Sequence, residues 1–193
     1  MKVEVLTGGA ILPAIPALAR LRIAVFAEWP YLYAGCLDYE EHYLRDFAAA
    51  DNAVLVLARD GDDIIGASTA SPMLAQAADI RVPVAEYGLD TACIFYFGES
   101  VLLPQYRGRG LGHAFFDGRE DHACQCGAQS AMFASVIRPA DHPARPADYR
   151  PLDAFWQARG YEKVDGLTCQ IAWQDHDEGA ETPKPLQFWR RGL

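Results

Sequence analysis

The sequence predicts one domain, residues 1–193, of mixed α/β (α+β) class, because strands and helices follow one another without strict alternation. Three observations support this. Two strand-like runs flank the turn residues Asp60 and Gly61, a long apolar run fills 92–103, and apolar residues recur at helical spacing in several other segments. Since 51% of the 193 residues are hydrophobic, the chain can bury a substantial core.

The remaining elements follow from local pattern. Val3 and Val5 alternate with charged residues and predict a first strand, whereas residues 75–91 are a less regular insertion. The other expected elements are helices at 16–28, 39–50, 110–127 and 151–159, and strands at 53–71 (a hairpin), 92–103, 130–137 and 167–173. Arg119 is a charged exception on the apolar side of the helix at 110–127. We expect residues 174–193 to form a C-terminal extension or an edge strand.

Composition limits the partners and the compartment. A net charge of -9 argues against general binding to nucleic acid or to an anionic membrane. Pro13, Pro16, Arg20 and Arg22 interrupt the apolar N-terminal region, so we expect neither a signal peptide nor a membrane span. Five scattered cysteines predict a reduced, cytoplasmic chain.

A metal site is not expected. His122, Cys124 and Cys126 are spaced by two, which on a helix directs the side chains to nearly opposite sides, and no second cluster completes a tetrahedral set.

The segment "VLLPQYRGRGLG", residues 101–112, concentrates glycine at a strand-to-helix turn. Backbone N–H groups at such a turn, together with the helix N-terminus, form a site suited to phosphate. A Walker loop needs Gly-Lys-Ser/Thr, but His113 and Ala114 follow Gly112, and a dinucleotide fingerprint needs a different glycine spacing. The alternative is a turn that only allows tight packing of strand on helix.

Residues Gln105–Gly110, "QYRGRG", match the pattern Q/R-x-x-G-x-G/A and closely resemble the acetyl-CoA-binding segment of the GNAT superfamily of N-acetyltransferases. The segment "AFWQARGYEKV", residues 154–164, resembles the superfamily's "FYEKLGF" helix and turn, and the order of elements up to about residue 173 is also similar. The resemblance implies a mixed, mostly antiparallel sheet of about six or seven strands with helices on both faces. It also implies acetyl-CoA as co-substrate.

The resemblance implies that the amides of 107–112 bind the CoA diphosphate, with charge from Arg107 or Arg109, and that the backbone at 101–103 pairs with the pantetheine. The implied acetyl-CoA-binding residues are Val101, Leu102, Leu103, Gln105, Tyr106, Arg107, Gly108, Arg109, Gly110, Leu111, Gly112, Phe155 and Trp156.

Glu99 is the only acid on the strand before the turn and is the candidate general base. Relatives often carry their acid one place earlier, where this chain has Gly98, so simple alternation would direct Glu99 to the other side of the sheet. A β-bulge would restore it to the productive face. Base and structural anchor both stay open.

The candidate proton donors to the departing thiolate are Tyr149 and Tyr96, because Trp156 occupies the family's usual tyrosine position. Both tyrosines could instead be packing or acceptor-site residues, and water could serve as donor.

The resemblance implies that the acceptor lies near two loops, 28–41 and 138–150. The first loop favours an ammonium-bearing acceptor through charge and cation–π attraction, because it combines aromatic and acidic residues: Trp29, Tyr31, Tyr33, Glu28, Asp38, Glu40 and Glu41. The arginines of the second favour an acceptor with a carboxylate or phosphate: Arg138, Arg145 and Arg150.

The preferred function is acetyl transfer to a small-molecule amine. A non-catalytic acyl-CoA-binding module and an acetyltransferase for protein or peptide amines are the alternatives. The oligomeric state, including a homodimer, stays open.

Overall fold

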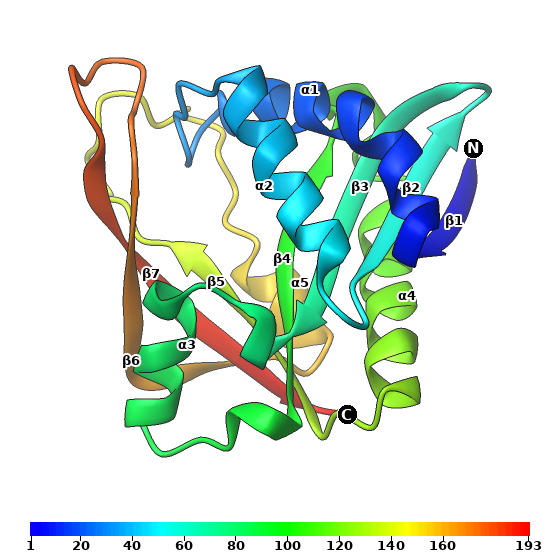
Figure 1. The fold of residues 1–193 in the computed structure, drawn as a ribbon. Helices are drawn as coiled ribbons and strands as arrows, with labels where there is room; N and C mark the ends of the chain where they lie inside the picture. Colours follow the sequence, from blue (N-terminus) through cyan, green and yellow to red (C-terminus); the bar gives the residue numbers. More distant parts are fainter.

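Seven strands form one sheet in the order β1-β2-β3-β4-β5-β7-β6 (Figure 1). The structure, a computed structural model, describes every residue from Met1 to Leu193. The strands are β1 (Lys2–Thr7), β2 (Val54–Asp60), β3 (Asp63–Pro72), β4 (Ile94–Leu102), β5 (Ser130–Val136), β6 (Glu162–Trp173) and β7 (Thr182–Gly192). Only β4 and β5 pair in parallel. The predicted mixed, mostly antiparallel sheet is therefore confirmed.

Helices cover both faces of this sheet (Figure 1). They are α1 (Ile15–Phe26), α2 (Leu37–Ala49), α3 (Ala78–Glu86), α4 (Leu111–Gln125) and α5 (Asp153–Ala158). Leu18 of α1 and Leu44 of α2 pack with Val101 in one core cluster, whereas Phe115 of α4 packs with Phe97 in another. Phe97 and Val101 of β4 thus enter cores on opposite faces of the sheet, although strict alternation over four residues would place both on one face.

The C-terminal strand is not at the edge of the sheet, so that prediction is wrong. β7 lies between β5 and β6, and β6 is the edge strand. The physical reason is burial on both faces: Phe188 joins the core beneath α3, and Trp189 joins the core beneath α4. Both side chains are fully buried. A run this apolar suits an interior strand better than an edge.

The region expected to be irregular contains the helix α3. Pro83 within it obscured the helix, because proline in a helix interior removes a hydrogen-bond donor. Packing of the helix against β6 compensates for the missing donor, since Val84 is fully buried in a cluster with Leu167 and Cys169 of β6. Tertiary contact outweighs local preference over these nine residues.

The N-terminal segment Gly8–Phe26 is long and apolar enough, by length and composition alone, to cross a membrane, with a mean hydropathy of 1.6. Three of its apolar residues pack inside the domain: Ile11, Ile15 and Leu18 lie fully or almost fully buried against the sheet and α2. A core helix of a globular domain has the same composition.

The parallel seam between β4 and β5 is short. Only Ile94–Tyr96 of β4 pairs with Ser130–Met132 of β5. β4 nevertheless pairs with β3 as far as Leu102, and β5 pairs with β7 as far as Val136. The two strands diverge beyond the seam (Figure 1). Each therefore has an edge without a strand partner in the middle of the sheet, immediately before the glycine turn.

Candidate functional site

The glycine turn joins β4 to α4 through a backbone conformation that requires glycine. Gly108 has φ of +74° and Gly110 has φ of +83°, a region that residues with a side chain rarely adopt. A Cβ at either position would meet no protein atom within 4 Å, so the space beside both is open. Gly112 differs: its Cβ would lie 3.4 Å from the ring of Phe155 on α5.

Five consecutive amides in this turn, residues 108–112, donate to no acceptor within the protein. The next two N–H groups, those of His113 and Ala114, donate to the carbonyl of Gly110 and begin the helix. Unpartnered amides at a helix N-terminus attract an anion through their hydrogen-bonding capacity and the helix dipole. The residues present therefore fit a diphosphate.

The two arginines of the turn are exposed and anchored differently. Arg107 Nη2 lies 2.9 Å from Glu28 Oε2, which ties the turn to the loop after α1. Arg109 Nη2 donates to the carbonyl of Gln105 at 3.0 Å, and its guanidinium lies 5.3 Å from the centre of the Tyr106 ring. Both side chains lie beside the open amides.

A β-bulge in β4 determines where Glu99 points. Ser68 pairs with Ser100 and Ala70 pairs with Phe97, so Thr69 alone faces both Gly98 and Glu99. The amide of Glu99 donates to Thr69 Oγ1 at 3.3 Å, and a Cβ at Gly98 would approach the same oxygen to 2.5 Å. The bulge turns the Glu99 side chain toward α1 and α2, the face that simple alternation would deny it.

Glu99 there joins a buried charged cluster with Arg22 of α1 and Glu40 of α2. Arg22 Nε donates to Glu40 Oε2, and Arg22 Nη1 contacts Glu99 Oε1 at 2.5 Å. Apart from Arg22, no protein donor contacts Glu99 Oε1. The cluster contains two carboxylates and one guanidinium, and Glu40 is 1% exposed.

Tyrosines surround this cluster and respond to its charge. Burial, followed by the charge of Glu99, raises the pKa of Tyr31 to about 12. Burial and hydrogen bonding to Glu40 raise the pKa of Tyr33 above its ordinary value. The structure therefore brings two predicted acceptor-site residues, Tyr31 and Tyr33, to the buried carboxylates.

A model of the Acetyltransferase (GNAT) family matches residues 21–147, about two thirds of the chain and the part that contains the cluster, the bulge and the turn. The chain belongs to the GNAT acetyltransferase family. GNAT members use acetyl-CoA and act on amine acceptors that are small molecules or peptides. A search of curated proteins finds no match.

Solved GNAT structures have the same fold. A ribosomal-protein-alanine N-acetyltransferase from Brucella melitensis superposes with a TM-score of 0.64 at 13% identity over 100% of both chains. The yncA protein of Salmonella typhimurium, solved with acetyl-CoA, gives a TM-score of 0.60 at 12% identity, over 100% of this chain and 95% of the other. An N-acetyltransferase from Staphylococcus aureus gives 0.62 at 10% identity, over 100% and 99%.

Trp156, at the usual GNAT tyrosine position, is part of an aromatic core. Its ring centre lies 5.0 Å from that of Phe133 and 5.1 Å from that of Trp189. The preceding Phe155 packs against Phe116 at 5.7 Å. Both predicted acetyl-CoA-binding residues of α5 thus have structural contacts beside the turn.

The two candidate proton donors lie in different environments. Tyr149, in the loop after β5, is half-buried, with its ring 5.9 Å from that of Trp29. Tyr96 is buried on the Glu99 face of β4, and burial raises its pKa well above the ordinary value. Burial also raises the pKa of Tyr149, so both hydroxyls stay protonated at neutral pH.

The acceptor loops are tied together by an arginine that the sequence suggested for ligand binding. Arg138 forms a bidentate pair with Asp175, at 2.6 and 2.9 Å, and donates to the carbonyls of Pro30 and Tyr31. Its donors are occupied within the protein, so Arg138 does not offer an anion site. It holds the loop after α1 against the β6–β7 hairpin.

Sequence reasoning missed Arg22 as a member of the site and placed Glu40 only among the acids of the acceptor loop, without its pairing to Arg22. A signal was present: Arg22 continues the buried stripe of Ile15 and Leu18 on α1, and Glu40 shares a stripe with Leu44 on α2. Charged residues on apolar stripes are rarely buried unless paired, so each required a partner.

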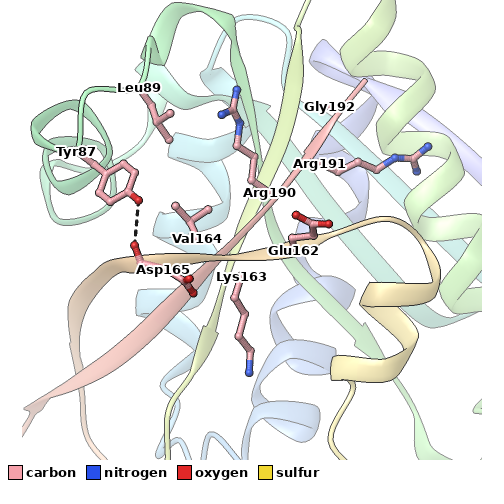
Figure 2. Close-up of a pocket in the computed structure, with 9 residues that line it drawn as sticks. All are labelled: Tyr87, Leu89, Glu162, Lys163, Val164, Asp165, Arg190, Arg191 and Gly192. Atoms are coloured by element: carbon pink, nitrogen blue, oxygen red, sulfur yellow. Dashed lines mark hydrogen bonds between the residues drawn. The ribbon is translucent and has the colours of Figure 1, made fainter.

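A hollow separate from the glycine turn lies at the end of the β5–β7 pair that is opposite the divergent strands (Figure 2). It has a volume of about 380 Å³ and is lined by Tyr87, Leu89, Glu162, Lys163, Val164, Asp165, Arg190, Arg191 and Gly192. Its arginines and lysine have protein partners, such as Glu120 for Arg191 and Asp153 for Lys163. No group of three or more metal-ligating side chains occurs in the chain.

Proposed function

We propose that the chain transfers the acetyl group of acetyl-CoA directly to the amine of a small molecule, with Glu99 as general base. One observation supports this above the others: a buried carboxylate, held by Arg22, lies on the strand that leads into five unpartnered amides. When bound, acetyl-CoA supplies the thioester whose acetyl group is transferred.

The chain's own backbone and side chains would hold this co-substrate. The amides of 108–112 would bind the diphosphate, and the free edge of β4 at Leu102 would pair with the pantetheine amides. Arg107 and Arg109 lie close enough to add charge, although Arg107 would exchange its contact with Glu28 for a phosphate.

Glu99 would accept the proton that the amine releases as its nitrogen bonds to the acetyl carbon. The carboxylate is 7% exposed, so water competes weakly for its oxygens. Arg22 contacts one of these oxygens and Glu40 fixes Arg22, so the base has a defined orientation. Carboxylates that outnumber the guanidinium also favour an acceptor that arrives with a positive charge.

A proton must also reach the departing sulfur. Tyr149 is the preferred donor because its loop faces the acceptor loop through Trp29, and Tyr96 is the second candidate. A thiolate is a tolerable leaving group, since the ordinary pKa of a thiol is about 8.5, so a weak donor suffices.

The decisive experiment has two stages. A thermal-shift panel of acetyl-CoA, longer acyl-CoAs, NAD and ATP identifies the ligand. Release of free thiol is then measured with a panel of small amines and of peptides with free N-termini. Stabilisation by acetyl-CoA together with thiol release from at least one small amine is expected. No thiol release from any acceptor contradicts the proposal.

A non-catalytic acyl-CoA-binding module is the second candidate, and Trp156 favours it. An indole packed between Phe133 and Trp189 cannot replace a tyrosine as a proton donor. This function would give stabilisation by acetyl-CoA with no turnover.

Peptide acetylation is a third outcome of the same panel, prompted by the ribosomal-protein substrate in the name of the Brucella melitensis structure. It would give turnover with the peptides and none with the small amines.

We also propose a cytoplasmic location, because all five cysteines are unpaired. Sedimentation would decide between a monomer and a homodimer.

A further inference from the structure

Arg119 of α4 is a buried cation without a carboxylate partner. Its side chain is 2% exposed, and the groups it contacts are backbone carbonyls and aromatic rings. Burial lowers the pKa of Arg119 to about 10, which still leaves it charged at neutral pH. Arginine is rarely buried in this way, because desolvation of its charge is costly.

The contacts of Arg119 converge on the bulge of β4. Its Nη1 donates to the carbonyl oxygens of Thr69 and Glu99, both at 3.4 Å. Its Nε donates to the carbonyl of Phe115 at 3.1 Å. The guanidinium lies beside the rings of Phe97 and Phe116, 4.5 and 4.7 Å from their centres. The head group is thus fixed in both position and direction.

A bulge needs such a donor. Where two residues oppose one, the regular ladder is interrupted and carbonyl groups lose their cross-strand partners. Buried carbonyls without a donor destabilise the fold. Arg119 satisfies the two carbonyls that face each other across this bulge, and Thr69 Oγ1 accepts the amide of Glu99. Arg119 and Thr69 therefore hold the same backbone segment.

We infer that Arg119 is a positioning residue for Glu99, acting through the main chain from the opposite face of the sheet. The inference rests on the proposed function, in which Glu99 is the base. The α1 and α2 residues fix the carboxylate, whereas Arg119 fixes the backbone from which the carboxylate projects. A small displacement of a catalytic group is enough to reduce the rate of a reaction strongly.

The test compares Arg119→Met with Arg119→Lys and with Ala123→Gly. Methionine retains an apolar stem beside the two rings but donates nothing, whereas lysine can still donate to both carbonyls. Ala123 is a buried residue one turn further along α4 and makes no hydrogen bond to the bulge, so glycine there weakens the same helix without removing a donor from the carbonyls.

With the amine identified by thiol release, Arg119→Met is expected to lower kcat by about tenfold to a hundredfold, with KM for acetyl-CoA changed less than about twofold. Arg119→Lys should retain kcat within about threefold of the unchanged protein, because it keeps donors for both carbonyls. Ala123→Gly should lower the melting temperature and leave kcat unchanged. Equal kcat in Arg119→Met and Ala123→Gly would overturn the inference.

Hydrogen exchange tests the inference without an acceptor. Arg119→Met should speed exchange of the amides at 97–101 selectively, whereas Ala123→Gly should speed exchange along α4. The absence of turnover with every amine would defeat the proposed function alone, and unchanged exchange at 97–101 would defeat the inference. Should Arg119→Met fail to fold, Thr69→Val removes the other support of the bulge and should produce the same selective changes.

Discussion

The glycine turn and the charged cluster are built in opposite ways. The turn lies within twelve contiguous residues, 101–112, and presents backbone amides to solvent, with glycine supplying the required conformation at Gly108 and Gly110. The cluster consists of side chains from α1, α2 and β4, brought together from positions 22, 40 and 99 and removed from solvent. The first is a local property of the chain, and the second exists only after the fold has formed.

This difference predicts how substitutions in each region affect binding, activity and stability. A substitution in the turn should affect the co-substrate and little else. A substitution in the cluster should affect either the reaction or the stability of the whole domain, because removal of one partner leaves a buried charge.

The largest expected effect belongs to Glu99→Gln. If Glu99 takes the amine proton, kcat falls by about 10²- to 10⁴-fold, the usual contribution of a general base. KM for acetyl-CoA should change little. Steady-state kinetics decide this, with Asp46→Asn, at an exposed acid on α2, as the control. A loss of stability with kcat retained would instead identify Glu99 as a structural anchor.

The next effect concerns Glu40→Gln, which leaves Arg22 with one carboxylate. Because Glu99 still pairs with Arg22, the loss is that of one buried charged hydrogen bond, which lowers the free energy of unfolding by about 1.5 to 3 kcal/mol. Glu41→Gln breaks only the exposed pair with Arg45, whose N–O distance is 2.7 Å, and should cost less than about 1 kcal/mol. Urea denaturation measures both, and similar losses would contradict a distinct role for burial.

A matched pair of glycine substitutions tests the turn. Gly110→Ala and Gly127→Ala replace glycines of nearly equal φ, +83° and +80°, in open space. Both should lose about 1 kcal/mol of stability. Only Gly110→Ala should weaken acetyl-CoA binding, by about tenfold or more, as measured by calorimetry. Equal affinities for acetyl-CoA would place the diphosphate elsewhere.

The smallest effect is a pH dependence at the tip of the β6–β7 hairpin. Hydrogen bonds, first from Lys184 and then from the amide of Asp175, lower the pKa of Glu178 from 4.5 to about 2. Because the folded-state pKa is the lower one, the stabilisation is complete above pH 4.5 and disappears as the pH falls toward 2. The difference in melting temperature between the unchanged protein and Glu178→Gln should therefore shrink from pH 6 to pH 3. Glu181→Gln, at an exposed neighbouring position, should show no such change.

The comparison also explains which parts of the molecule the sequence could predict. Strands, most helices and the turn were predictable, because alternation, helical spacing and glycine act over short segments. The helix α3 was not, since its stability comes from Val84 packing on β6 rather than from its own residues. The edge assignment of β7 failed because sheet order depends on pairing between distant strands.

The same reasoning applies within the site. Glu99 could be named as a candidate, but its direction required the bulge opposite Thr69, and register between β3 and β4 is a tertiary property. The anion-binding role suggested for Arg138 was wrong because its guanidinium pairs with Asp175. That pairing was not visible in the sequence, since the two residues lie 37 positions apart. Buried pairs are visible in a sequence only as charges on apolar stripes, without the identity of the partner.

The parallel pairing of β4 with β5, which is only three residue pairs long, has a consequence for handling the protein. Exposed strand edges act as templates for another polypeptide, and here two such edges face each other inside the sheet. A ligand that lies between them completes the hydrogen bonding of the main chain. Concentrated ligand-free protein should therefore self-associate more readily than protein saturated with coenzyme, which light scattering would reveal.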